Sequence, residues 1–114
     1  MKLPIPAVLA VAVLGTSAQA TDLGTYLRDD VEPVTAYIED GLLFCTIVSD
    51  GFELCNGMVE QADGSWQGDK LKNPDMPGFM KFSGTITFEE GQMTLEGCTM
   101  GGKVCKSKTW PLQP

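Results

Sequence analysis

The chain has 114 residues, of which 43% are hydrophobic and 20% charged, and its formal net charge at pH 7 is −7. A chain of this length allows one small domain, which buries only about 60 to 70% of its unfolded surface and gains from cross-links. The acidic balance argues against binding nucleic acid or anionic membranes, since both need a basic surface. The sequence contains no histidine, which removes Ser-His and Cys-His nucleophile pairs and the commonest general base.

The first 20 residues have the pattern of a secretory signal peptide. Lys2 gives a positive charge, residues 7–14 form a short apolar core, and Ala-Gln-Ala at residues 18–20 fits a cleavage site. The apolar run is shorter than the about 20 residues of a membrane-spanning helix, so a retained anchor is the weaker interpretation. We therefore expect a cleavable signal peptide at residues 1–20, and one soluble periplasmic or secreted domain at residues 21–114.

Turn-forming residues divide this domain at nearly even spacing. They are the pairs at residues 40–41, 50–51, 63–64, 90–91 and 101–102 and the proline-rich cluster at residues 73–78. Short segments rich in strand-forming residues between such turns are typical of an antiparallel meander. The expected strands are residues 25–27, 34–38, 42–48, 52–59, 65–71, 79–88, 92–100 and 103–110.

Eight short strands in one small domain form either a barrel or a sandwich. Closure favours the barrel because it removes both sheet edges. We therefore predict an all-β fold, a single small antiparallel up-and-down β-barrel of about eight short strands. The interior of such a barrel holds either packed side chains or one small ligand.

Alternation of side chains identifies the inner face of the later strands. On the strand at residues 79–88, the apolar side chains at alternate positions are Met80, Phe82, Ile86 and Phe88. Met93 and Leu95 continue this face on the next strand. The predicted lining of the lumen is Phe82, Ile86, Met93 and Leu95.

The same alternation gives a conflict at the last hairpin. It places Cys98 and Cys105 outside but Lys106 and Lys108 inside, where an unpaired lysine is costly. Glycine in a strand is a common site of a β-bulge, which reverses the direction of the following side chains. We therefore expect a bulge at Gly97 that turns both cysteines inward and leaves both lysines in water.

Four cysteines allow three disulfide pairings, and the sequence alone does not choose among them. Cys45 and Cys55 are equidistant from the turn at residue 50, and Cys98 and Cys105 are equidistant from the turn at residues 101–102. Cross-strand partners lie close enough to bridge, so this symmetry favours the two local disulfides. A zinc site or a redox-active pair is a weaker interpretation, because the chain has no histidine and no Cys-x-x-Cys motif.

Adjacent carboxylates at residues 29–30, 39–40 and 89–90 are the remaining acid-base groups, and each pair borders a predicted turn. We expect no catalytic residue, metal or cofactor. Abundant aromatic side chains and methionines favour a binding protein for a small apolar or amphipathic ligand. The alternative is a structural or protein-interaction factor of the cell envelope with a filled barrel, including a protease inhibitor with residues 21–24 as its arm.

Several segments resemble an exported bacterial family known as domain of unknown function 2147. They are Gly-Thr-Tyr at residues 24–26, residues 43–48, Leu-Cys-Asn-Gly at 54–57, Trp-Gln-Gly at 66–68, Asn-Pro-Asp at 73–75, Leu-Glu-Gly-Cys at 95–98 and residues 104–110. The resemblance implies a lipocalin-like barrel, export and no assigned reaction. The chain departs from the family pattern at Tyr26, where the family has tryptophan, and at the connection at residues 49–51, which is shorter.

Overall fold

The computed structural model describes residues 20–77 and 80–114. Apart from its last residue, the predicted signal peptide lies outside the described residues, so its cleavage stays a prediction. Within the described ranges, no helix is long and apolar enough to cross a membrane.

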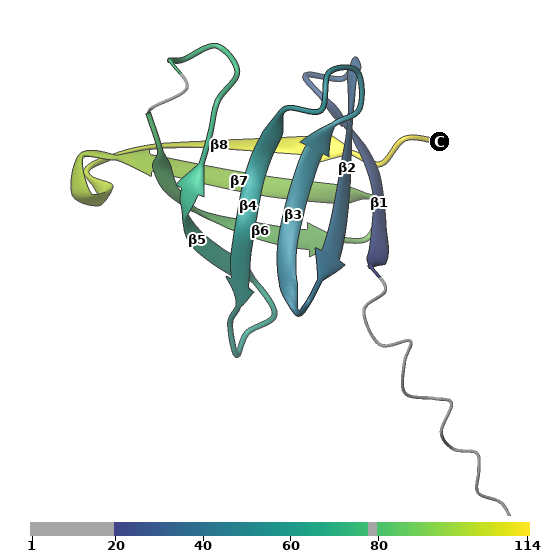
Figure 1. Cartoon of the computed structure of the whole chain (residues 1–114), viewed down its shortest axis with the longest axis horizontal. Coiled ribbons are helices and arrows are strands. Elements are labelled where there is room, and N and C mark those ends of the chain that lie inside the picture. Colours follow the sequence, from purple (N-terminus) through teal and green to yellow (C-terminus); the bar gives the residue numbers. More distant parts are fainter. Residues whose placement is uncertain (1–19, 78–79) are drawn as a thin grey trace, which may run out of the picture.

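Eight antiparallel strands follow one another in the order of the sequence, as Figure 1 shows. A 3-10 turn, η2 (Met100–Gly102), joins the last two strands. The strands are β1 (Thr21–Arg28), β2 (Glu32–Glu39), β3 (Leu42–Ile47), β4 (Glu53–Glu60), β5 (Trp66–Leu71), β6 (Phe82–Glu89), β7 (Gln92–Thr99) and β8 (Val104–Pro111). The predicted all-β meander of eight strands is confirmed.

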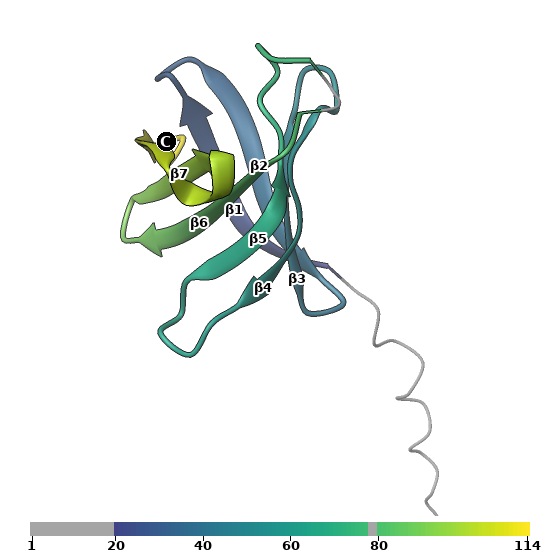
Figure 2. The ribbon, with the colours of Figure 1, turned by 90° about the vertical axis from the view of Figure 1, so that its left-hand side faces the viewer.

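The sheet curls until β8 returns to β1, which makes a nearly closed barrel (Figures 1 and 2). The C-terminal segment forms the seam between them. Tyr26 of β1 forms an isolated bridge with Leu112, and the Gln113 N–H donates to the carbonyl of Thr25 at 2.8 Å. The ring of Tyr26 packs against Phe88, with 5.8 Å between ring centroids. The up-and-down barrel predicted from the strand count is therefore present.

Residues 21–24 belong to β1 and do not form a free arm. Thr21 pairs with Ile38 and Gly24 pairs with Ala36 across the β1–β2 ladder. The prediction of an inhibitory arm at these residues is wrong, because the ladder uses their backbone groups. The segment that extends past its neighbours is instead the β7–β8 hairpin with η2 (Figure 1).

The pairing of β4 with β3 contains two irregularities that the sequence analysis missed. Gly57 is an extra residue between two paired positions and has a φ of 72°, a conformation that glycine adopts readily. Leu54 is the extra residue of the second irregularity. As a result, Leu54 and Cys55 are both buried although they are adjacent in the strand.

One part of the lumen is filled by packed side chains. Ile86 on β6 and Met93 on β7 are fully buried there, together with residues from β2, β3 and β4. The largest fully buried side chains are Leu43, Ile47, Met58, Ile86, Met93, Val34, Cys45 and Cys55. These side chains belong to one continuous core, which includes residues of all eight strands from Tyr26 on β1 to Trp110 on β8.

A row of three glycines crosses the barrel wall beside this core. Gly68 on β5 pairs with Gly84 on β6, which pairs with Gly97 on β7. A Cβ atom at Gly84 would overlap the Leu71 side chain and the Glu96 carbonyl, whereas a Cβ atom at Gly97 would meet nothing within 4 Å. The interior is therefore tightly packed at β6 and open at β7.

Candidate functional site: a cavity at the mouth of the barrel

A cavity of about 370 Å³ lies at the end of the barrel where β1, β5 and β7 end and β4, β6 and β8 begin. We call it the mouth cavity. Its apolar lining residues are Leu54, Leu71, Pro74, Met76, Phe82, Leu95, Val104 and Trp110. Its charged lining residues are Arg28, Asp29, Lys72, Asp75, Lys106 and Lys108. The cavity thus combines an apolar surface with charged groups.

The four side chains predicted to line the lumen are divided between the core and the cavity. Phe82 and Leu95 are partly buried and line the mouth cavity. Ile86 and Met93 are 0% exposed and belong to the packed core. Met80 precedes β6 and is 36% exposed, so its predicted place on the inner face is wrong. Phe79, which was expected to begin this strand, lies outside the described residues.

The predicted bulge at Gly97 is absent from both ladders of β7. Gly97 pairs with Gly84 and with Lys106 in continuous register, and Cys98 pairs with Cys105. Strict alternation therefore holds, and Lys106 and Lys108 line the cavity. The prediction that both cysteines point inward is wrong.

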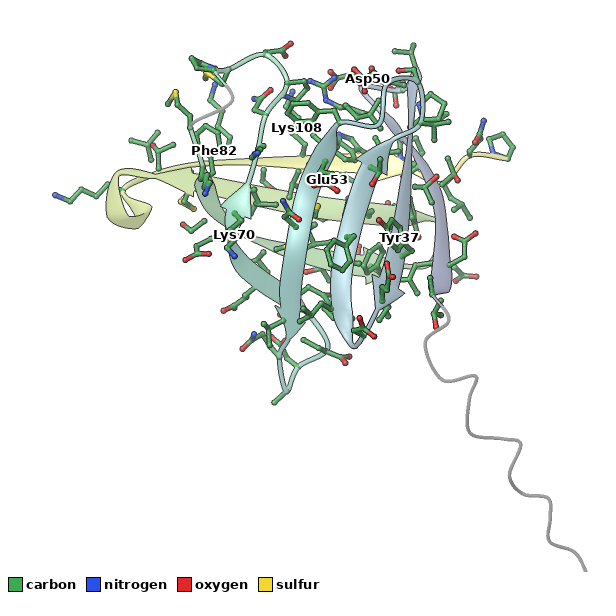
Figure 3. The ribbon with its side chains drawn as sticks, viewed as in Figure 1. Tyr37, Asp50, Glu53, Lys70, Phe82 and Lys108 are labelled. Atoms are coloured by element: carbon green, nitrogen blue, oxygen red, sulfur yellow. A yellow bond between two sulfur atoms is a disulfide. The ribbon has the colours of Figure 1, made fainter. Side chains whose placement is uncertain are left out.

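The lysines face inward without being desolvated because this end of the barrel is open. The Lys108 side chain is 60% exposed although it lines the cavity. Figure 3 shows Phe82 and Lys108 near the same end of the barrel, while Lys70 lies at β5. An unpaired lysine is costly in a closed lumen, but at the mouth water reaches the inner face.

The cysteines pair across strands as the hairpin symmetry predicts, but only one pair is bonded. Cys98 and Cys105 form a disulfide on the outer side of β7 and β8. Cys45 and Cys55 are opposed in the β3–β4 ladder, yet both are buried free thiols. The predicted Cys45–Cys55 bridge is therefore not formed in this structure. The register shift at Leu54 lies directly beside this pair and makes the ladder irregular there.

Ion pairs fix the chain around the rim of the cavity. The Arg28 guanidinium donates to Glu32 at 2.6 Å and to Asp75 at 3.2 Å. Asp75 lies between β5 and β6, so this contact ties that loop to the end of β1. The Lys108 ammonium lies 3.6 Å from an oxygen of Asp29. These surface pairs hold the geometry of the rim more than they stabilise the fold.

Trp110, which lines the cavity, carries a buried donor that lacks a partner within the described ranges. The residue is 4% exposed, and its Nε1–H has no hydrogen-bond partner among the described residues. A buried donor without an acceptor costs about 1 to 3 kcal/mol. The Nε1 atom is itself buried, so a ligand in the cavity meets the Trp110 side chain but does not reach this donor.

A second hollow, of about 470 Å³, lies on the outside of β5, β6 and β7. It is shallow, and the polar side chains that line it are those of Gln67, Asp69, Ser83, Thr85 and Glu96. Among the described residues, no group of three histidine, cysteine, aspartate or glutamate side chains is placed to hold a metal ion. The mouth cavity is the better candidate because it is less open to solvent and its walls are more apolar.

The carboxylate pairs noted in the sequence lie at turns, as their positions suggested. Asp29 and Asp30 have φ values of 54° and 66° in the turn that follows β1, and Asp40 has a φ of 55°. Glu89 accepts a hydrogen bond from the Gln92 side-chain amide at 2.7 Å, across the turn at residues 90–91. Of these groups, only Asp29 lines the mouth cavity.

No family model matches the chain, and comparisons with curated proteins and with solved structures also found no match. The resemblance to the exported bacterial family therefore stays a prediction from the segments quoted above.

Proposed function

We propose that this protein is an exported, non-enzymatic barrel that binds a small amphipathic ligand in the mouth cavity. The observation that carries the proposal is a pocket whose walls are apolar and whose rim is charged. Small-molecule sites typically have this composition, with few polar groups that orient the ligand. Leu95 and Phe82 supply apolar walls, and Trp110 supplies an aromatic side chain.

The volume of the cavity restricts the ligand to a small molecule. At about 370 Å³, it lies near the lower limit of the roughly 300 to 1,000 Å³ that is usual for ligand pockets. At the packing density of protein interiors, this space holds roughly a dozen non-hydrogen atoms. A single alkyl chain of medium length or one ring system with a polar group fits it.

Export is supported by two features of the chain. The first 20 residues have the composition of a signal peptide. The Cys98–Cys105 disulfide suits an oxidising compartment such as the periplasm. The resemblance to an exported family without an assigned reaction supports the same proposal.

Titration with 1-octanol, followed by two-dimensional ¹H–¹⁵N NMR, tests ligand binding. We expect saturable shifts confined to the cavity, including the Trp110 indole N–H and the Gly97 amide. Substitution of Trp110 by phenylalanine distinguishes its indole signal from that of Trp66.

Gly97→Leu is the decisive variant because its side chain has open space and lies in the cavity wall. Its four carbons should occupy about a third of the space for roughly a dozen non-hydrogen atoms, preserve the fold and weaken octanol binding about tenfold. Ser107→Leu adds the same side chain to an exposed position on the outside of β8, and should leave binding unchanged. If Gly97→Leu binds octanol as the parent protein does, the cavity is not the site, and the protein-interaction alternative gains support.

A further inference from the structure

We propose that the mouth cavity selects anionic amphiphiles, with the acidic head group held by Lys72, Lys106 and Lys108. This inference rests on the proposed function and names its ligand class. The alkyl part of the ligand would contact Phe82 and Leu95.

The distribution of basic residues carries the inference. The chain has a net charge of −7 and only eight basic residues. Four of these eight line this one cavity, namely Arg28, Lys72, Lys106 and Lys108. An acidic protein that gathers half of its cations at a single opening attracts anions to that opening, in spite of its overall charge.

The carboxylates around the cavity do not neutralise these cations. Arg28 is occupied by Glu32 and Asp75, and Lys108 has one contact with Asp29, at 3.6 Å. Lys72 and Lys106 form no ion pair with any described residue. Two ammonium groups are therefore unpaired, and a third is only weakly paired at the rim.

The inner face of β8 places these charges next to the apolar walls. Its alternating inward residues are Val104, Lys106, Lys108 and Trp110, all of which line the cavity. Lysine stems extend along apolar surface while their ammonium groups stay in water. A head group at the lysines leaves the attached chain beside Leu95, which pairs with Lys108 across the ladder.

Three ligands with the same eight-carbon chain separate the head-group preference from binding itself. At pH 7.5, octanoate carries a negative charge, 1-octanol none and octylamine a positive charge. We expect octanoate to bind at least fivefold more tightly than octanol, and octylamine to bind most weakly because like charges oppose it. Raising NaCl from 0.05 to 0.5 M should reduce the advantage of octanoate and leave octanol unchanged, since salt screens exposed charges.

The double variant Lys72→Gln/Lys106→Gln tests the two unpaired lysines. Each exposed ion pair contributes a factor of roughly two to five, so loss of both should weaken octanoate binding roughly 4- to 25-fold, with octanol within twofold. Lys70→Gln/Lys103→Gln is the matched control, because it removes the same charge at exposed positions outside the cavity. It should leave the preference for octanoate intact.

The outcomes distinguish the two proposals. If octanol binds at the mouth and Gly97→Leu blocks it, but octanoate shows no advantage, the charge inference is overturned and the proposed function stands. Equal weakening of octanoate by the two double variants also overturns it, because the effect would then come from net charge alone. If none of the three ligands shifts the cavity signals, the proposed function fails, and the inference fails with it.

Discussion

The packed core and the mouth cavity lie on the same two strands, yet they differ in what fills the inner face. On β6, Ile86 is fully buried while Phe82 lines the cavity, and on β7 the same change occurs between Met93 and Leu95. The two residues of each pair are one or two alternate positions apart. In a short barrel, an inward-facing side chain therefore either packs in the core or lines the cavity, depending on its distance from the open end.

The largest difference in stability is expected between two variants that truncate one inward side chain each, one in the core and one in the cavity. Met93→Ala should lower the free energy of unfolding by about 2 to 5 kcal/mol, because it leaves a void in a packed core. Leu95→Ala should cost only about 1 kcal/mol, since Leu95 is partly buried beside solvent. Urea denaturation of both variants measures the difference. Equal losses would mean that the mouth is as tightly packed as the core.

A smaller difference in stability is expected when a methyl group is added to either of two paired glycines, Gly84 and Gly97. Gly84→Ala should cost about 1 to 3 kcal/mol, because its Cβ overlaps Leu71 and the Glu96 carbonyl. Gly97→Ala should be neutral or stabilise the fold by up to about 1 kcal/mol, because its Cβ meets nothing and alanine is more restricted in the unfolded chain. Melting temperatures of the two variants check this. Destabilisation by Gly97→Ala would contradict an open wall at β7.

The smallest effect concerns the two thiols inside the core. Burial raises the pKa of the Cys55 thiol well above its usual range, and the hydrogen bond and charge of Cys45 act in the same direction. Because the unfolded thiol ionises first, stability should fall as pH rises above about 8.5. Urea denaturation between pH 7 and 10 should show this decline, which a Cys45→Ala/Cys55→Ala variant should lack.

Thiol counting on the same protein supplies the control for this prediction. Without a reductant, the native protein should show no reactive thiol because both are buried, and the protein in denaturant should show two. No thiol in denaturant would mean that Cys45 and Cys55 are bonded, as the hairpin symmetry first suggested.

Sequence patterns predicted the strands well because each strand is marked by residues within it and in the turns beside it. Turn pairs at even spacing mark the hairpins, and the β6 alternation placed Phe82 and Ile86 on one face, which the structure confirms. The irregularity at Gly57 had a signal in the sequence, a glycine inside an expected strand. The one at Leu54 had none, because its neighbours read as an ordinary strand.

The mouth cavity itself was beyond the sequence analysis for a physical reason. Whether Lys106 and Lys108 can face inward depends on where water enters the lumen. That in turn depends on where the eight strands end relative to one another. Once the opening is known, the unbroken alternation through Gly97 explains the same residues without a bulge.

The seam between β1 and the C-terminal segment has a consequence for how the chain folds. Every ladder in the sheet joins strands that are consecutive in sequence, so the hairpins form from short-range contacts. The contacts of Tyr26 and Thr25 with Leu112 and Gln113 instead close a loop that spans nearly the whole domain, and such long-range contacts form slowly. Closing the seam is therefore expected to be the last step of folding, and the β1–β8 edge is exposed to other chains until then.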